Sequence, residues 1–273
     1  MRIILLSIFT VFILFIGLLI TRLWGQGQQY ADFQHPYFEG TRPVIILKAK
    51  SVQEIDEAIA AKPDIAIWLN VETTFDKKVI VFGKEFLQTE MPFESYRGPR
   101  PMAYESQLIK RIRPEIRELK DIVAKYPKQR FILNILDNIE HVQEWVTAAT
   151  KNVGGEKRFI LQSDYNVVIN SIKDLEPFWL YGSSQADLMR FMAFESMWIL
   201  PAVQFKGDVY VSPFKLMKRP AFSDDIIAEV RRRKKKIVLG PATTKAEFDD
   251  ASRLIADGIV IENLSNFSTW TRP

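Results

Sequence analysis

Three acidic residues stand close to the ends of predicted strands, where side chains are well placed for chemistry. They are Glu72, Asp164 and Glu262. A pair of carboxylates could hydrolyse a glycosidic bond, and several carboxylates together could hold a divalent cation. Acidic residues at strand ends also serve as helix caps, and the spacing of these three selects none of the roles.

The chain offers few other groups for acid–base or nucleophilic chemistry. It has no cysteine, which excludes disulfides, thiolate metal sites, a cysteine nucleophile and the attachment point of a bacterial lipoprotein anchor. Its two histidines are His35 and His141. His35 precedes Pro36 in a polar segment and is expected to be a surface-loop residue. The spacing of Asp137 and Glu140 predicts a capping box, so we expect the adjacent His141 to lie in a first helical turn rather than in a catalytic site.

The N-terminal segment from Ile3 to Thr21 carries no charge and is dominated by Ile, Leu and Phe. As a helix it would span roughly 28 Å, close to the hydrocarbon thickness of a bilayer, with Trp24 at the headgroup level. The run exceeds the apolar region of a typical signal peptide and no small-x-small site follows, which favours an anchor over residues 1–24 rather than a cleaved signal.

The orientation of this anchor is less strongly specified, because Arg2 and Arg22 flank the span on opposite sides. A short N-terminal tail before a single span normally stays in the cytoplasm. The sequence therefore predicts a single-pass membrane protein whose bulk faces the periplasm or the exterior.

The rest of the chain divides into a polar linker (25–42), one domain (43–267) and a tail (268–273). In the domain, short β-branched runs alternate with amphipathic stretches, which indicates βα units and a parallel sheet. The predicted strands are Val44–Leu47, Ile65–Val71, Phe131–Ile135, Phe159–Gln162, Phe178–Tyr181, Val209–Ser212, Ile237–Leu239 and Gly258–Ile261. The predicted helices are Val52–Ala61, Glu115–Tyr126, Ile139–Thr150, Tyr165–Leu175, Gln185–Met197, Asp224–Arg233 and Lys245–Ile255. This number of units matches a (β/α)8 TIM barrel, and a doubly wound open sheet also fits the alternation.

The stretch from Ile65 to Leu87, IAIWLNVETTFDKKVIVFGKEFL, resembles the signature of the glycerophosphodiester phosphodiesterase family. There the second barrel strand reads I-E-L-D-V and is followed by x-x-T-x-D-G, an apolar run and H-D-x-x-L. The apolar frame is kept here, together with Thr74 and Asp76. The family's functional positions carry other residues: Trp68 and Asn70 replace the two strand carboxylates, and Gly83 and Lys84 replace the His-Asp pair.

The resemblance continues as an ordered series of partial matches over residues 43–267. Ile112 to Leu119 is similar to the family's I-P-T-L-E-E-V-L, and Ile255 to Glu262 keeps the middle of its G-V-D-G-I-I-T-D. The third strand ends in Asn134-Ile135-Leu136 where the family has E-I-K, and the H-R-G loop after the first strand looks deleted. The resemblance implies a TIM barrel without its catalytic residues.

Hydrolysis of the kind that the resemblance implies needs a divalent cation held by carboxylates, plus an acid and a base. Asn70 and Asn134 offer carbonyl oxygens without charge, and Trp68 fills space. We therefore expect a membrane-anchored, catalytically inactive barrel without a cofactor, acting as a ligand-binding or scaffolding module. The alternative is a divergent, active phosphodiester hydrolase of lipid or glycerophosphodiester metabolism, with Asn70, Glu72, Asn134 and Glu262 around weakly held Ca²⁺ or Mg²⁺.

Cationic residues are expected at the mouth of the barrel, at strand ends or in the long loop that follows the second strand: Lys48, Lys84, Arg97 and Arg100. They would attract an anionic small molecule or a lipid headgroup, although solvated loop charges are the plain alternative. The net charge of +4 is mild and predicts no nucleic-acid partner. The basic run from Arg231 to Lys236 ends a helix that opens with acids, which stabilises the helix itself, and anionic lipid is its functional alternative.

Overall fold

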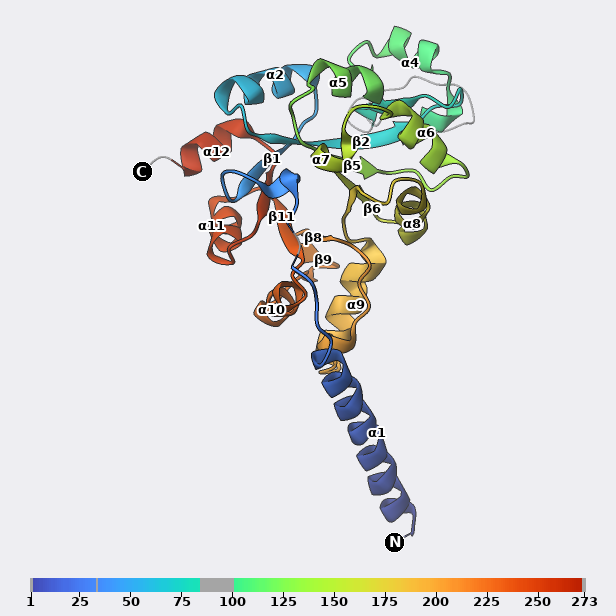
Figure 1. The fold of residues 1–273 in the computed structure, drawn as a ribbon, viewed down its shortest axis with the longest axis vertical. Helices are drawn as coiled ribbons and strands as arrows, with labels where there is room; N and C mark the ends of the chain where they lie inside the picture. The colour runs from blue at the N-terminus through green and yellow to red at the C-terminus, as the bar shows by residue number, and fades with distance from the viewer. Residues whose placement is uncertain (1, 33, 84–100, 272–273) are drawn as a thin grey trace.

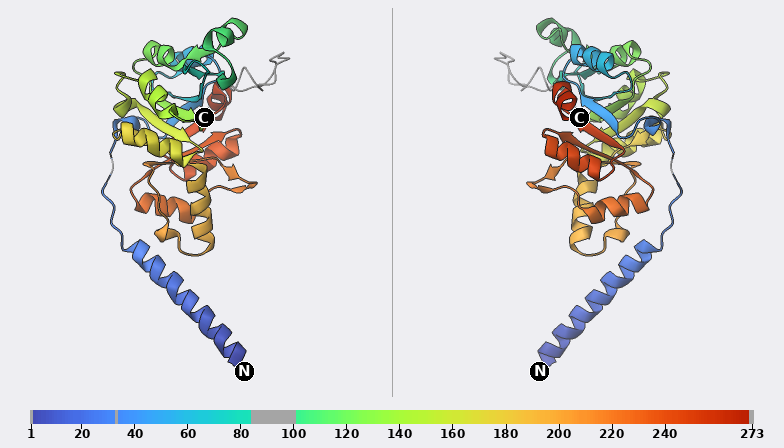
Figure 2. Two further views of the ribbon diagram at one scale, coloured as in Figure 1. Left: turned by 90° about the vertical axis from the view of Figure 1, so that its right-hand side faces the viewer. Right: turned by 90° about the vertical axis from the view of Figure 1, so that its left-hand side faces the viewer.

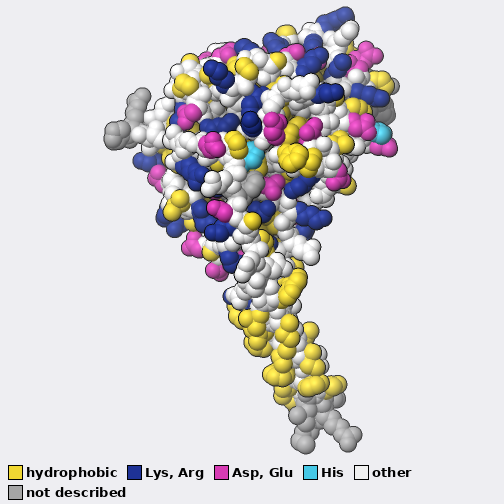
Figure 3. Space-filling view, viewed as in Figure 1, with side chains coloured by type: hydrophobic (Ala, Val, Ile, Leu, Met, Phe, Trp, Pro, Cys, Tyr) yellow, Lys and Arg dark blue, Asp and Glu magenta, His cyan; other side chains and the backbone are white. Residues whose placement is uncertain are grey.

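The structure is a computed structural model that describes residues 2–32, 34–83 and 101–271. A long N-terminal helix, α1 (Arg2–Gln26), projects from a domain of strands and helices (Figure 1). Residues Leu6–Gln26 form a segment long and apolar enough to cross a membrane, and none of its most apolar stretch is buried against the domain. The apolar surface of α1 contrasts with the mixed charges over the domain (Figure 3). The structure thus contains one candidate transmembrane helix within the described residues.

Eight parallel strands form the sheet of the domain. In neighbour order they are β7 (Leu180–Tyr181), β6 (Phe159–Ser163), β5 (Phe131–Ile135), β2 (Ala66–Thr73), β1 (Val44–Lys48), β12 (Gly258–Ile261), β11 (Lys236–Ala242) and β8 (Val209–Ser212). The backbone N–H of Asp208 donates to the carbonyl of Tyr181 at 2.7 Å, and the Ser183 hydroxyl contacts both the N–H and the carbonyl of Val211. These bonds bring the two edge strands together, so the sheet is a nearly closed barrel, as predicted, and not an open sheet.

Helices cover the outside of the barrel (Figure 2). They are α2 (Val52–Ala61), α4 (Ser106–Ile112), α5 (Leu119–Lys125), α6 (Val142–Ala149), α7 (Gly155–Arg158), α8 (Asn166–Leu175), α9 (Gln185–Ser196), α10 (Asp224–Arg232), α11 (Lys245–Arg253) and α12 (Leu264–Trp270). Their apolar faces follow helical spacing. In α8, for example, Val168, Ile169 and Ile172 are buried against the sheet.

Two apolar layers make the core. The outer layer lies between strands and helices, whereas the inner layer takes alternate residues from all eight barrel strands. Tyr37 and Phe38 from the short helix η1 (Pro36–Phe38) belong to the inner layer and are almost fully buried. The structure therefore differs here from the expected linker, because these two aromatic rings close the barrel end from which the strands start.

Two boundaries differ from the prediction for identifiable reasons. The strand β7 begins only at Leu180, since Phe178 lies in the preceding turn with 80% of its surface exposed. Helix α5 begins at Leu119, because Arg117–Glu118 instead form the short strand β4, which pairs with β3 (Val79–Val81) beside β2. A second small hairpin, β9 (Lys215–Leu216) with β10 (Arg219–Pro220), follows β8.

Candidate functional site

The site expected from the sequence lies where the barrel strands end. Alternation along β2 places Trp68 and Asn70 on the same inward face as Ala66, which is part of the inner core layer. The parallel register then sets Asn134 of β5 directly beside Asn70 and sets Gln162 of β6 beside Asn134. A row of neutral polar side chains thus crosses three adjacent strands.

Hydrogen bonds join the members of this row. The side-chain amide of Asn134 donates to Oδ1 of Asn70 at 2.9 Å, and the indole N–H of Trp68 donates to the same oxygen at 3.3 Å. Asn70 is buried, with 4% of its surface exposed. An amide oxygen has two lone pairs, so two N–H donors satisfy it.

Gln162 is a member of the row that the sequence analysis missed. Its amide nitrogen donates to the carbonyl of Ser183 at 2.6 Å, whereas its Oε1 is buried and has no hydrogen-bond partner among the described residues. A Cβ atom at Gly182 would lie 2.0 Å from that oxygen. The glycine directly after β7 was the available signal, because a residue without a side chain is needed where the Gln162 amide packs against the backbone.

Lys48 lies at the carboxyl end of β1, as expected. Its ammonium is 3.4 Å from Oε1 of Glu262, which follows the neighbouring strand β12. Both side chains are about one-third exposed or less. The ion pair offsets the charge of Lys48, so Lys48 alone gives the mouth little net positive charge. The other expected cations, Lys84, Arg97 and Arg100, lie outside the described residues.

The resemblance aligns Gly83 with a histidine of glycerophosphodiester phosphodiesterases. Gly83 is buried beside Glu72, and a Cβ atom on it would lie 2.4 Å from Oε2 of that carboxylate. A side chain at residue 83 therefore requires Glu72 to move.

The two polar residues that match the family signature in the turn after β2 have a structural role. Asp76 accepts hydrogen bonds from the Thr74 hydroxyl at 2.7 Å and from the backbone and hydroxyl of Ser106 at 2.8 and 2.6 Å. Burial alone would raise the pKa of Asp76, but these hydrogen bonds outweigh it and hold the pKa below its usual value. Asp76 thus fastens the turn to the start of α4.

Neither histidine lies among the polar residues of the mouth. His141 is the residue before α6 in a left-handed conformation, and its exposed ring contacts Glu144 and Glu140 at 3.0 and 3.5 Å. The predicted capping box is wrong, because Asp137 instead accepts the backbone N–H of Thr73 at 2.5 Å. His35 accepts the backbone N–H of Tyr37 at the opposite end of the barrel, and partial burial lowers the pKa of its imidazole.

These residues do not fit the divalent cation that the resemblance implies. The oxygen of Asn70 already accepts two N–H groups, Glu262 is paired with Lys48, and Trp68 has no ligand atom for a hard cation. Within residues 2–32, 34–83 and 101–271, no group of three or more His, Asp or Glu side chains is arranged to hold a metal ion. Asp164 is exposed beyond β6.

Additional positive charge comes from the β9–β10 hairpin, which sequence analysis did not identify. The hairpin follows β8 and so extends from the end of the barrel where the strands terminate (Figure 2). Its side chains Lys215, Lys218 and Arg219 are exposed. The short spacing of these three basic residues was an available signal, but nothing in the sequence placed them at the mouth.

Comparison with known proteins identifies the fold. The chain superposes on a solved structure from Silicibacter pomeroyi, assigned as a glycerophosphoryl diester phosphodiesterase, with a TM-score of 0.64, 13% identity, and coverage of 86% of this chain and 95% of that one. A glycerophosphodiester phosphodiesterase from Thermotoga maritima gives a TM-score of 0.60, 15% identity and coverage of 84% and 99%. A phosphodiesterase from Oleispira antarctica was solved with the product sn-glycerol-3-phosphate. It gives a TM-score of 0.60 and 11% identity, with coverage of 84% of this chain and 96% of that one.

No family model and no curated protein matches the sequence. The chain therefore has the barrel fold of glycerophosphodiester phosphodiesterases, and the resemblance expected from the sequence is confirmed at the level of fold.

Proposed function

We propose that this protein is a membrane-anchored barrel that binds an anionic ligand at its mouth and does not hydrolyse phosphodiesters. One observation carries the proposal. Asn70 stands where the resembling family has a metal-binding carboxylate, and its oxygen is bonded to the N–H groups of Trp68 and Asn134. A hard cation brought to this oxygen would have to break both bonds and would gain no negative charge from Trp68, Asn70 or Asn134 in return.

Positive charge at the mouth supports an anionic ligand. Lys215, Lys218 and Arg219 are exposed on the hairpin after β8, at the end of the barrel where the strands terminate. Cations on loops at this end attract a phosphate-bearing small molecule or a lipid headgroup. Since the Oleispira antarctica phosphodiesterase was solved with sn-glycerol-3-phosphate, that compound is a suitable first probe.

The second candidate function is a divergent phosphodiester hydrolase. The solved structures with the same fold are named phosphodiesterases, which favours it. In this case Glu72 and Glu262 would supply charge to a weakly bound Ca²⁺ or Mg²⁺, and Asn70 and Asn134 would supply neutral oxygens. Binding of either metal would then stabilise the folded state in proportion to ln(1 + [L]/Kd). The binding proposal predicts no such stabilisation.

The test of the binding proposal is calorimetric titration of the full chain in detergent with sn-glycerol 3-phosphate, alongside glycerol as the uncharged control. We expect binding of the phosphate only, and about tenfold weaker binding when Lys215 and Arg219 are both changed to Ala, because charge-assisted contacts to phosphate are lost. Lys157→Ala, at an exposed position on α7, is the matched control. Equal heats of binding from glycerol and glycerol phosphate would contradict the proposal. The absence of binding by either compound would also contradict it and would favour a scaffolding role.

The membrane anchorage is also part of the proposal. We propose that α1 spans the membrane and that the barrel lies on the periplasmic or extracellular side. Because the chain has no cysteine, Asn170→Cys on the exposed face of α8 gives a single labelling site. Labelling of intact cells by a membrane-impermeant maleimide is expected, and labelling only after cell lysis would place the barrel in the cytoplasm.

A further inference from the structure

The end of α1 is packed against the barrel. Gly25 is buried, and a Cβ atom there would lie 2.3 Å from the carbonyl carbon of Pro201 in the turn η3 (Leu200–Ala202). The guanidinium of Arg232, at the end of α10, donates to the carbonyls of Gly25, Gln26 and Gln28 at 3.1 to 3.3 Å. These bonds satisfy carbonyls at a helix end that have no partner within the helix. These contacts therefore fix the position of the end of α1 relative to the barrel.

Trp198, from the turn after α9, lies beside the C-terminal half of α1. Its ring stacks near Phe15, at 6.5 Å between centroids, and the guanidinium of Arg22 lies 4.2 Å from its centroid. Trp198 and the adjacent Met197 are nearly half exposed. Arg22 is the first charge after the uncharged run of α1. Tryptophan and arginine beside the end of an apolar span are typical of the headgroup region.

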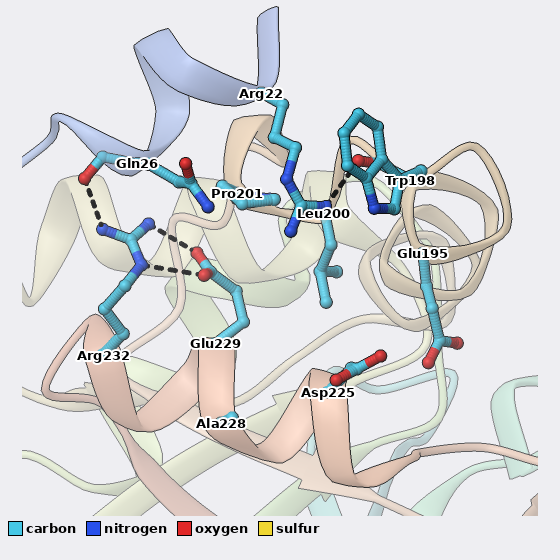
Figure 4. A pocket seen from close by; sticks show the side chains of 10 residues that line it. All are labelled: Arg22, Gln26, Glu195, Trp198, Leu200, Pro201, Asp225, Ala228, Glu229 and Arg232. Carbon is cyan, nitrogen blue, oxygen red and sulfur yellow. Dashed lines mark hydrogen bonds and ion pairs between the residues drawn. The ribbon is translucent and has the colours of Figure 1, made fainter. Parts of the chain in front are cut away.

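A cavity of about 250 Å³ opens at this level between α1, the end of α9, η3 and α10 (Figure 4). Arg22 enters it from α1. The guanidinium of Arg22 donates one hydrogen bond, to the Trp198 carbonyl at 2.8 Å, within the described part of the chain. Its other N–H groups remain for a ligand.

Carboxylates lie on the opposite wall of the cavity, where Arg232 is already paired with Glu229. Asp225 of α10 and Glu195 of α9 line it across from Arg22 (Figure 4). The hydroxyl of Ser223 donates to Glu195, whereas the exposed carboxylate of Asp225 makes no hydrogen bond or ion pair with any described residue. A cation on one wall and carboxylates on the other complement a molecule that carries both charges.

We propose that this cavity binds the phosphoethanolamine headgroup of a membrane phospholipid, an inference that rests on the proposed membrane anchorage. Arg22 binds the phosphate through its guanidinium, and Asp225 and Glu195 accept hydrogen bonds from the primary ammonium. A phosphocholine headgroup lacks ammonium N–H groups and would need an open aromatic face. Arg22 already covers a face of Trp198, so the cavity favours ethanolamine over choline.

The test uses the full chain in detergent micelles and follows its thermal unfolding as short-chain lipid is added. A lipid that binds the folded state raises the unfolding temperature. We expect dihexanoyl phosphatidylethanolamine to raise it, and equal amounts of the choline and glycerol phospholipids to raise it much less. In Arg22→Gln and Asp225→Asn chains the apparent affinity for the ethanolamine lipid should fall about tenfold, as for loss of a charge-assisted hydrogen bond. Asp224→Asn, adjacent but outside the cavity lining, is the matched control.

Equal stabilisation by all three lipids would overturn the inference, and so would an unchanged affinity for the ethanolamine lipid in Asp225→Asn. Soluble phosphoethanolamine that stabilises the chain as strongly as the lipid would also overturn it, because the cavity would then be a site for a free metabolite. A vesicle flotation assay separates the inference from its premise. A chain that fails to float with vesicles of any composition contradicts the anchorage itself. A chain that floats equally with all vesicles, and shows no ethanolamine preference in the micelle titration, contradicts the headgroup site alone.

Discussion

Asn134 donates a hydrogen bond to Asn70 across the β2–β5 pair, at 2.9 Å between nitrogen and oxygen. The resemblance aligns both residues with acidic positions of glycerophosphodiester phosphodiesterases, and in this chain the two side chains are amides in contact with each other. Carboxylates at this distance would repel each other without a metal, whereas two amides attract. The hydrogen bond between the two amides therefore joins β2 and β5 at the mouth of the barrel without the help of an ion.

Replacing Asn70 by Ala tests this contact. The change removes the acceptor of both the Asn134 amide and the Trp68 indole, and buried donors without acceptors are costly. We expect the free energy of unfolding to fall by about 1–3 kcal/mol in urea titrations. Asn170→Ala on the exposed face of α8 should change it by less than about 0.5 kcal/mol. Equal effects of the two substitutions would show that the network contributes nothing to stability.

A second prediction concerns the close approach of Gly182 and Gln162. A methyl group at residue 182 would lie 2.0 Å from Oε1 of Gln162, whose amide nitrogen is fixed by the carbonyl of Ser183. We expect Gly182→Ala to reduce the free energy of unfolding by about 1–3 kcal/mol. The same substitution in a Gln162→Ala chain should cost at least about 0.5 kcal/mol less, a coupling energy that a double-mutant cycle measures. Additive effects would contradict the contact.

Gly25 and Gly27 provide a matched pair for the junction between α1 and the barrel. A Cβ atom at Gly25 meets the backbone of Pro201, whereas a Cβ atom at Gly27 lies 3.6 Å from its nearest neighbours. Spin labels at Thr10→Cys and Ser171→Cys in the cysteine-free chain report the distance between α1 and the barrel. We expect Gly25→Ala to broaden or shift that distance distribution and Gly27→Ala to leave it unchanged. An unaffected distribution in both chains would mean that the contact does not hold the helix.

Acid should weaken the same region through Glu229. Burial on its own raises the pKa of this carboxyl, but hydrogen bonds and charges from Arg232 and Arg233 outweigh it, so the folded-state pKa lies below the ordinary 4.5. A carboxyl with a lowered pKa contributes stability that is present above about pH 4.5 and is lost as the pH falls through the folded-state value. Urea titrations between pH 6 and pH 3 should therefore show a declining free energy of unfolding, with a smaller decline in Glu229→Gln than in the control Glu115→Gln.

Glu229→Gln should also be costly near neutral pH. Arg233 is 4% exposed and pairs with Glu229 at 2.6 Å, so the substitution leaves a buried guanidinium without its counter-charge. Breaking a buried pair from one side costs about 3–5 kcal/mol, and the urea titration at pH 7 measures it. A loss below about 1 kcal/mol would indicate that the carbonyls of Pro201 and Val203, which Arg233 also binds, suffice to stabilise it.

The barrel could be predicted from the sequence because each strand is a short apolar run whose inward and outward residues are both buried. Three of the eight strands, β5, β8 and β12, begin and end at the predicted residues, and the others differ by one to three residues at an end. The positions of Trp68, Asn70 and Asn134 at one end of the barrel also followed from the pattern. The order and register of the strands place these residues at that end, whatever chemistry their side chains have.

Contacts between distant segments could not be predicted. The bond from Asp137 to the backbone of Thr73 replaced a local capping pattern, since tertiary contacts compete with local ones for the same carboxylate. Tyr37 and Phe38 enter the core from a segment that is polar on average. The basic run binds carbonyls of other segments through Arg231, Arg232 and Arg233, an arrangement that depends on helices brought together by the fold.

Hydrolysis of glycerophosphocholine by the full chain in detergent, with and without millimolar Ca²⁺ or Mg²⁺, tests the central claim most directly. The bonded amides at Asn70 and Asn134 predict no hydrolysis above background with either metal, and no shift of the unfolding temperature when the metal is added. Metal-dependent hydrolysis that disappears in Glu72→Ala or Glu262→Ala would contradict this account and identify a divergent phosphodiesterase.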